Sequence, residues 1–209
     1  MIFLVFTVGS SPGNTNSDKA PAALSLPPRY VQGTARRAWS NRFIIAAIVQ
    51  GAVITGLTLA FVAAQMLTSG TNIIQFLSLS FEGPAKWFFL GYIFYMILVV
   101  VAIAVTAVFY NHLEVGMGRQ IKGFRSVLAW IHLVGMNVGG AATTITIIFA
   151  GLAGSGILGV ILEGTGSLQP NAVIMDQFVP LIAAFTGLLS IGVLAGGLAY
   201  ITTYLQRKQ

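Results

Sequence analysis

The sequence contains no cysteine and little charge. The absence of cysteine among its 209 residues excludes disulfides, thiolate metal sites, iron–sulfur clusters and cysteine nucleophiles. Only 8% of the residues are charged, whereas 56% are hydrophobic, and the mean hydropathy is +0.86. Soluble domains carry roughly 25% charged residues. The composition therefore excludes an ordinary cytosolic enzyme and a disordered chain, and it indicates an integral membrane protein.

Four continuous apolar runs account for most of the hydropathy. They extend over residues 43–67, 87–110, 127–152 and 178–205. A helix needs about 20 apolar residues to cross the hydrocarbon core of a bilayer, and each run exceeds that length. The runs do not alternate between polar and apolar residues, as strands of a membrane barrel would. We predict an all-α, four-helix transmembrane bundle.

A polar leader precedes the first run. Residues 1–10 are apolar but too short to span a bilayer, and residues 11–34 are rich in Ser, Pro, Asn and Gly. We therefore predict a leader over residues 1–42 and a transmembrane domain over residues 43–209. The connection at residues 68–84 contains the apolar segment NIIQFLSLSF, which predicts a short interfacial helix.

Basic residues are confined to alternate connections, and ten of the eleven lie on one predicted side: Lys19, Arg29, Arg36, Arg37, Arg42, Arg119, Lys122, Arg125, Arg207 and Lys208. The other side holds only Lys86. Lysine and arginine accumulate in loops that stay in the cytoplasm. We predict a multi-pass protein of the cell (plasma) membrane with both termini in the cytoplasm. This asymmetry explains the net charge of +6 without nucleic-acid binding.

The two histidines are the principal candidates for a cofactor site. His112 follows the second run, and His132 lies about five residues inside the third. On neighbouring antiparallel helices, the two imidazoles would lie at similar depth near the cytoplasmic side. Such a pair can ligate the iron of a haem b, hold a metal or contact a quinone headgroup. The alternative is structural, with His112 as an interfacial polar residue and His132 hydrogen-bonded to Asn137 or a threonine.

Carboxylates are absent from all four runs. An ion-coupled transporter or a pump usually has at least one buried carboxylate, so this absence argues against both. Glu114, in the basic connection, can orient an imidazole or pair with Arg119, and we expect the pair. The sequence contains no plausible Ser–His–Asp set, zinc-protease motif, paired carboxylates or phosphate-binding loop. We expect no catalytic residue in the chain alone.

Glycine pairs at a spacing of four residues predict close helix packing. Gly135 and Gly139 form one pair in the third run, and Gly192 and Gly196 form another in the fourth. Small residues allow the backbones of membrane helices to approach closely. We expect these glycines to form a packing seam, within the bundle or with a partner subunit.

Residues 110–140, YNHLEVGMGRQIKGFRSVLAWIHLVGMNVGG, resemble small accessory membrane subunits of archaeal respiratory oxidases of the haem–copper type. The WIHL start of a glycine-rich helix also resembles parts of the core helices of those oxidases. A haem–copper core needs more histidine ligands than the two present here. The resemblance therefore implies an accessory subunit or a small b-type haem carrier.

The resulting hypothesis is a membrane subunit of a larger, respiratory electron-transfer complex. It would bind other membrane subunits, act mainly in packing and contact haem or quinone at His112 and His132. A small channel or carrier is one alternative, which would need a polar stripe along a helix. A ligand-free scaffold or assembly factor is another, and it would tolerate replacement of both histidines.

Overall fold

The structure, a computed structural model, describes residues 38–67, 72–73, 75, 83–163 and 170–206. The predicted leader before residue 38 and most of the predicted interfacial helix lie outside the described residues. All regular structure within them is helical: α1 (Ala38–Leu67), α3 (Ala85–Phe94), η1 (Tyr95–Val101), α4 (Ala102–Asn111), η2 (His112–Gly116), α5 (Phe124–Val134), η3 (Gly135–Gly140), α6 (Ala141–Gly154), α7 (Ile157–Glu163), α8 (Ala172–Asp176) and α9 (Val179–Tyr204). The segments labelled η are π-helical turns that continue the α-helices beside them.

Each predicted apolar run forms one long helix that is long and apolar enough to cross a membrane. The four helices extend over Ala38–Leu67, Ala85–Gly116, Phe124–Gly154 and Ala172–Tyr204. Each begins before its apolar run, because the helical backbone continues into the flanking polar residues. The all-α fold with four transmembrane-length helices is thus confirmed, and the chain is a multi-pass membrane protein.

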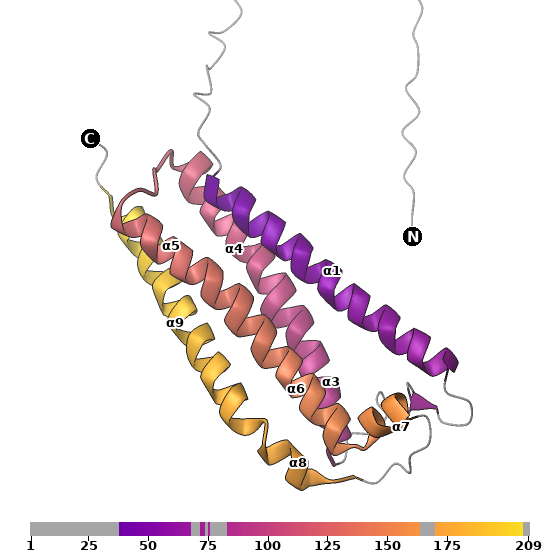
Figure 1. The fold of residues 1–209 in the computed structure, drawn as a ribbon. Coiled ribbons are helices and arrows are strands. Elements are labelled where there is room, and N and C mark those ends of the chain that lie inside the picture. The colour runs from indigo at the N-terminus through magenta and orange to yellow at the C-terminus, as the bar shows by residue number, and fades with distance from the viewer. Residues whose placement is uncertain (1–37, 68–71, 74, 76–82, 164–169, 207–209) are drawn as a thin grey trace, which may run out of the picture. The chain divides into compact units, whose positions relative to one another are not determined.

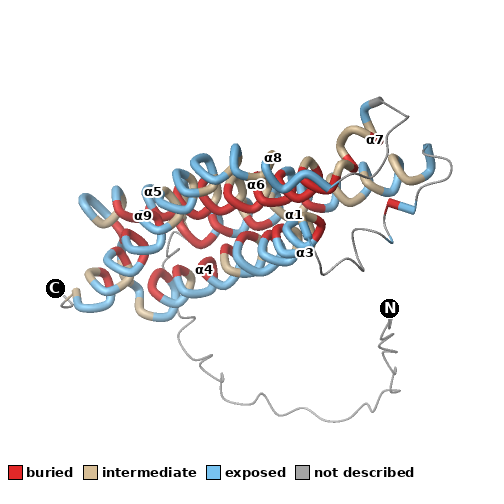
Figure 2. Tube along the Cα trace, turned by 90° about the horizontal axis from the view of Figure 1, so that it is seen from below, coloured by how far each residue is buried: buried red, intermediate tan, exposed pale blue. Residues whose placement is uncertain are grey.

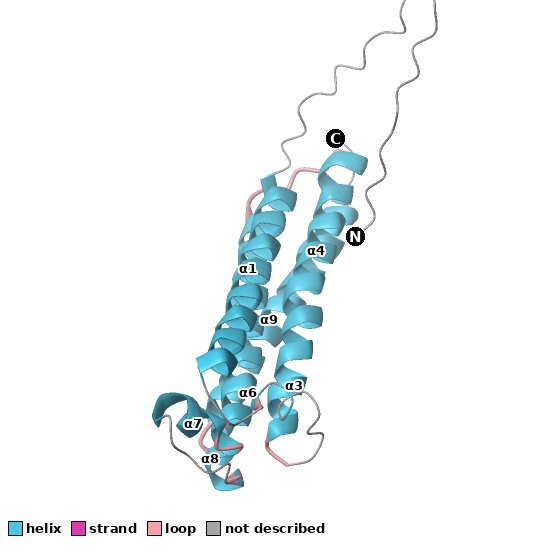
Figure 3. Ribbon diagram, turned by 90° about the vertical axis from the view of Figure 1, so that its right-hand side faces the viewer, coloured by secondary structure: helices cyan, strands magenta, loops and turns pink. Residues whose placement is uncertain are grey.

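The third long helix is the centre of the bundle. In its most apolar window 56% of the residues are buried, against 17%, 22% and 11% in the first, second and fourth. α6 packs along α3, α5 and η3 pack along α9, and α1 packs along α4 and η1. Figure 1 shows these helices side by side, Figure 3 shows that they run along one common direction, and Figure 2 shows buried residues concentrated along α6. The first and fourth helices leave most of their apolar surface exposed.

The connection between the second and third long helices turns at two glycines. Gly118 has a φ of 62° and Gly123 a φ of 58°, in the left-handed region that glycine adopts at no steric cost. The turn returns the chain so that α5 starts beside the end of the second helix (Figure 1). Residues near the end of α4 and the start of α5 therefore lie together.

Candidate functional site around His132

The side chain of His132 contacts each of the other three long helices. Its ring centroid lies 5.2 Å from that of Phe43 in α1 and 5.9 Å from that of Tyr110 in α4. Its Nδ1 atom lies 3.3 Å from the Tyr110 hydroxyl oxygen. On a further side it faces Gly196 of α9, where an added Cβ would overlap the imidazole ring. With only 8% of its surface exposed, His132 is the buried residue at which all four long helices meet.

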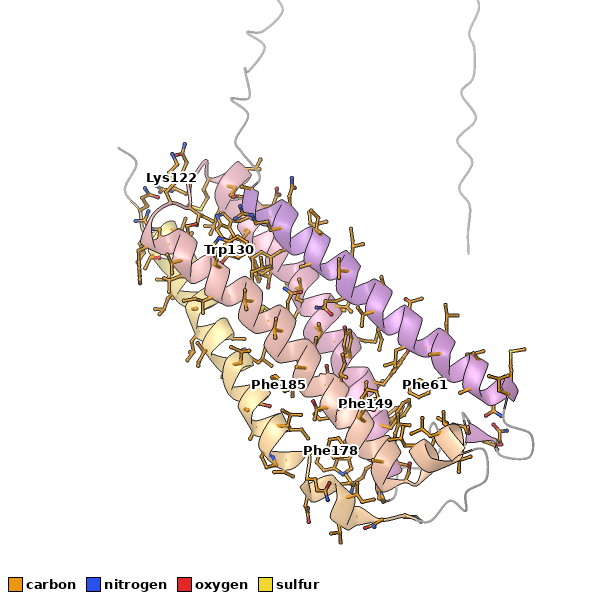
Figure 4. All side chains as sticks on the ribbon, viewed as in Figure 1. Phe61, Lys122, Trp130, Phe149, Phe178 and Phe185 are labelled. Atoms are coloured by element: carbon orange, nitrogen blue, oxygen red, sulfur yellow. The ribbon has the colours of Figure 1, made fainter. Side chains whose placement is uncertain are left out.

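An aromatic cluster fixes the partners of His132. The rings of Phe43 and Tyr110 stack with centroids 4.8 Å apart, and Trp39 lies 6.3 Å from Tyr110 and 5.5 Å from Trp130. The Arg42 guanidinium lies 4.5 Å and 4.8 Å from the Trp39 and Trp130 ring centroids, within cation–π range of both. Figure 4 labels Trp130 on α5, toward the same end of the bundle as Lys122. The cluster therefore joins α1, α4 and α5 at that end.

Glu114 holds the start of α1 against the end of the second helix. It accepts hydrogen bonds from the backbone N–H groups of Trp39, at 3.0 Å, and Ser40, at 3.2 Å, one to each carboxylate oxygen. The first N–H groups of a helix have no partner within it, and they form its positive end. The buried carboxylate satisfies two of these donors. The expected pair with Arg119 is absent: both carboxylate oxygens bond to α1, and the Arg119 Nε atom has no hydrogen-bond partner among the described residues.

A cavity of about 530 Å³ lies beside His132, within the size range of small-molecule sites. It is lined by side chains from α4, α5, η3 and α9: Ala102, Thr106, Phe109, Tyr110, His132, Met136, Val193, Gly196, Gly197, Tyr200 and Ile201. Three of these are about half exposed, namely Phe109 at 53%, Val193 at 51% and Ile201 at 54%. Because they lie within transmembrane-length helices, the cavity opens sideways between α4 and α9, toward the region that hydrocarbon would occupy.

The cavity is apolar apart from a few hydroxyl groups and the imidazole. None of its lining residues is Asp, Glu, Lys or Arg. The Thr106 hydroxyl already donates to the Ala102 carbonyl at 2.8 Å. The Nε2 atom of His132, by contrast, has no hydrogen-bond partner within the described part of the chain. Because His132 lines the cavity, its free imidazole nitrogen is a candidate contact for a ligand.

The two predicted histidine ligands lie in different environments. His112 begins η2, is exposed and does not line the cavity that holds His132. A haem with two histidine ligands needs the imidazoles on opposite faces of one macrocycle. The described residues also contain no group of three or more histidine and carboxylate side chains that could hold a metal ion. Ligation of a haem or metal by this pair stays a prediction.

The four predicted packing glycines lie in one interface within the bundle. A Cβ added to Gly135 would be 2.5 Å from the Gly192 Cα, and one added to Gly139 would be 2.5 Å from the backbone nitrogen of Leu189. At Gly196 the neighbour is instead a side chain, the His132 ring. The backbones of the third and fourth helices are therefore in direct contact, which we call the glycine seam: Gly135, Gly139, Gly192 and Gly196.

A polar cluster near mid-span joins α1, η1 and η3 by hydrogen bonds between helices. The Gln50 amide donates to the Asn137 Oδ1 atom at 3.1 Å, and the Tyr95 hydroxyl donates to the Gln50 Oε1 atom at 2.5 Å. Asn137 also donates to the Leu133 carbonyl at 2.8 Å. Asn137 is thus a partner of Gln50, whereas the structural alternative for His132 had named Asn137 or a threonine as its partner. The signal for this cluster in the sequence was the presence of polar residues at similar depths in three of the apolar runs.

The chain was also compared with known proteins. No protein-family model, characterised protein or solved structure matches it.

Proposed function

We propose that this protein is an integral membrane subunit that binds a lipid-soluble small molecule in the cavity beside His132. One observation carries the proposal: a buried imidazole with an unpartnered nitrogen lines an apolar cavity that opens between two exposed helices. Small-molecule sites are mostly apolar, with a few polar groups that fix the orientation of the ligand. An unpaired polar atom in an apolar site is unfavourable, so a ligand that completes the hydrogen bond stabilises the site.

The lining leaves room for a ligand at the fourth helix. Gly197 lines the cavity and lies on the exposed face of α9, and a Cβ added there would meet nothing within 4 Å. Gly187, ten residues earlier on α9, is also exposed and equally free of neighbours, but it does not line the cavity. These two glycines make a matched pair for testing the proposal.

The test is to fill the cavity with a larger side chain and identify which bound compound is no longer recovered with the protein. Wild-type protein, Gly197→Phe and Gly187→Phe are purified from their own membrane in mild detergent, and extracted small molecules are identified by mass spectrometry. We expect one lipid-soluble compound to be enriched with wild-type protein and Gly187→Phe and depleted with Gly197→Phe. The same extract from all three proteins, or no compound beyond bulk phospholipid, would show that the cavity is not a binding site.

We further propose that the subunit works within a larger respiratory electron-transfer complex and contributes binding and packing to it. The support is the resemblance of residues 110–140 to accessory oxidase subunits and the absence of a catalytic constellation among the described residues. A channel or carrier has less support, because Gln50, Tyr95 and Asn137 bond to one another and do not line the cavity. Co-purification of redox subunits with a tagged chain tests the complex, and isolation of the tagged chain alone would contradict it.

The orientation that we propose places the Glu114 end of the bundle in the cytoplasm of a cell-membrane protein. It rests on the segregation of basic residues, because Arg119, Lys122 and Arg125 all lie in the connection at this end. The chain has no cysteine, so single replacements are unique labels. In intact cells an impermeant thiol reagent should label Asn171→Cys and not Gln120→Cys. The reverse pattern would overturn the orientation.

A further inference from the structure

We infer that the ligand of the His132 cavity is a membrane quinone, bound by the His132–Tyr110 pair in both its quinone and its quinol form. This inference rests on the proposed function and narrows the ligand to one chemical class. It follows from three properties of the site: the absence of charge, the space beside the imidazole, and the two directions in which the hydrogen bond between Tyr110 and His132 can run.

The absence of charge selects a neutral headgroup. No lining residue is charged. Two ionic groups at this end of the bundle are engaged away from the cavity. Glu114 accepts two backbone hydrogen bonds from α1, and Arg42 lies over the Trp39 and Trp130 rings. A carboxylate or phosphate headgroup would be buried without a counter-charge, which is strongly unfavourable. Fatty acids and phospholipids are therefore poor ligands for this site.

The space beside the imidazole suits a planar ring with an apolar tail. An apolar cavity of about 150 Å³ is enough to hold benzene, and this one has about 530 Å³. Ala102 and Gly197 contribute little side-chain volume to its lining. At its edge, the rings of Phe109 and Tyr200 meet edge to face at 5.9 Å. A ring can lie inside, and its tail can leave between α4 and α9 into lipid.

The His132–Tyr110 pair can present either a donor or an acceptor. When the Tyr110 hydroxyl donates to Nδ1, the proton of the neutral imidazole lies on Nε2, which then donates to a quinone carbonyl. When Nδ1 carries the proton and donates to the Tyr110 oxygen, Nε2 accepts from a quinol hydroxyl. The two states differ in the tautomer of the imidazole: its proton moves from Nε2 to Nδ1, and the Tyr110 hydroxyl keeps its own proton but turns it away from Nδ1. This change of tautomer matches the exchange of acceptor for donor that distinguishes a quinone from its quinol.

The experiment measures binding to full-length protein in phosphatidylcholine nanodiscs, with empty nanodiscs correcting for partition into lipid. Four probes with tails of equal length are titrated: a benzoquinone, its quinol, a prenyl alcohol and a fatty acid. We expect the quinone and the quinol to bind with similar Kd values and at least about tenfold more tightly than the other two. Gly197→Phe should abolish this binding, and Gly187→Phe should retain it.

Two variants test the hydrogen bonds. His132→Leu should weaken quinone and quinol alike by about tenfold, the effect of one hydrogen bond. Tyr110→Phe keeps the ring packing and removes only the hydroxyl that hydrogen-bonds to His132 Nδ1. It should weaken the binding of quinone and quinol by a smaller factor. If His132→Leu fails to fold, Tyr110→Phe and the comparison of probes on wild-type protein decide the matter.

The outcomes separate the two proposals. If the prenyl alcohol or the fatty acid binds as tightly as the quinone and is lost in Gly197→Phe, the cavity is a binding site but the quinone assignment is wrong. If none of the four probes binds more than to empty nanodiscs, the quinone assignment is overturned, and the proposed function is then decided by the extracted compounds. If Tyr110→Phe binds quinone and quinol as tightly as wild-type protein does, Tyr110 has no part in binding, and the assignment to the His132–Tyr110 pair is wrong.

Discussion

The two sides of the third long helix are packed in opposite ways. Toward α9 the glycine seam brings backbone against backbone, and a single added Cβ would overlap the neighbouring helix. Toward α1 the contacts are made by long side chains, from Trp39 on Trp130 to Gln50 on Asn137. Without water between membrane helices, both close packing and interhelical hydrogen bonds are available to join them. This bundle uses the first on one side and the second on the other.

The difference explains where the cavity lies. His132 is the residue that both sides share, since its ring packs on Phe43 toward α1 and on Gly196 toward α9. The seam brings α9 close to the third helix, while α4 packs chiefly on α1. Space remains between α4 and α9, and it is lined by His132 and Tyr110. Substitutions on the two sides should therefore change the free energy of unfolding by different amounts and for different reasons.

The largest effect is expected at the glycine seam. Gly135→Leu should lower the free energy of unfolding by about 3 kcal/mol, because the side chain has no space beside the Gly192 backbone. Gly56→Leu in α1, where an added Cβ meets nothing within 4 Å, is the matched control and should change it little. Denaturation by sodium dodecyl sulfate from mild micelles measures both. Equal stability of the two variants would show that the seam is not formed.

The next largest effect is expected at the start of α1. Glu114→Ala should lower the free energy of unfolding by about 2 kcal/mol, because two helix N–H groups lose a charged acceptor. Glu114→Gln retains one oxygen acceptor and should lose about half as much. Arg119→Ala should have little effect. A loss from Arg119→Ala as large as that from Glu114→Ala would favour the ion pair over the cap.

A smaller effect is expected from the polar cluster at mid-span. Side-chain hydrogen bonds between membrane helices average about 0.6 kcal/mol, so Gln50→Leu, which removes those to Tyr95 and Asn137, should cost about 1 kcal/mol. Thr55→Val is a suitable control, because that hydroxyl donates only within α1, to the Gly51 carbonyl. The same denaturation assay applies. A loss no greater than that of the control would remove the cluster from the packing of α1.

The smallest effect is expected at Arg42. Its guanidinium lies over two indole rings at the exposed end of the bundle, where a cation–π contact contributes about 0.5 kcal/mol. Arg42→Gln should lower the free energy of unfolding by about that amount, and Trp130→Ala should reduce the further effect of Arg42→Gln. Arg125→Gln makes the same charge change at the same end. Indistinguishable results for the two arginines would assign the effect to net charge.

The sequence predicted the four long helices, because unbroken apolar runs of sufficient length need only composition to be recognised. The spacing of Gly135, Gly139, Gly192 and Gly196 also pointed to close packing, although not to the partner of each glycine. The spacing of residues in an α-helix could not predict which residues Glu114 contacts. Glu114 lies in the π-helical turn η2, which winds more residues per turn than an α-helix and so changes the direction of each side chain.

The candidate site was predictable only in part for a related reason. His132 stood out as a titratable residue within a run, but its neighbours Phe43 and Tyr110 are common aromatic residues in apolar sequence. Their contact with His132 depends on how three helices pack, and no short-range pattern encodes that. The sequence placed His112 and His132 at similar depth, which does not decide whether their side chains approach each other. Depth fixes a position along a helix and leaves its direction around the axis open.

The most direct test of the cavity is to record what occupies it in the native membrane. A photoreactive benzoyl-phenylalanine is placed at Phe109, on the rim, or at Val49 in α1, which is equally exposed at 53% but lies away from the cavity. After irradiation of whole membranes, mass spectrometry identifies the adducts. We predict a discrete quinone adduct at position 109 and only bulk phospholipid at position 49. The same phospholipid adducts at both positions would contradict a ligand site at His132.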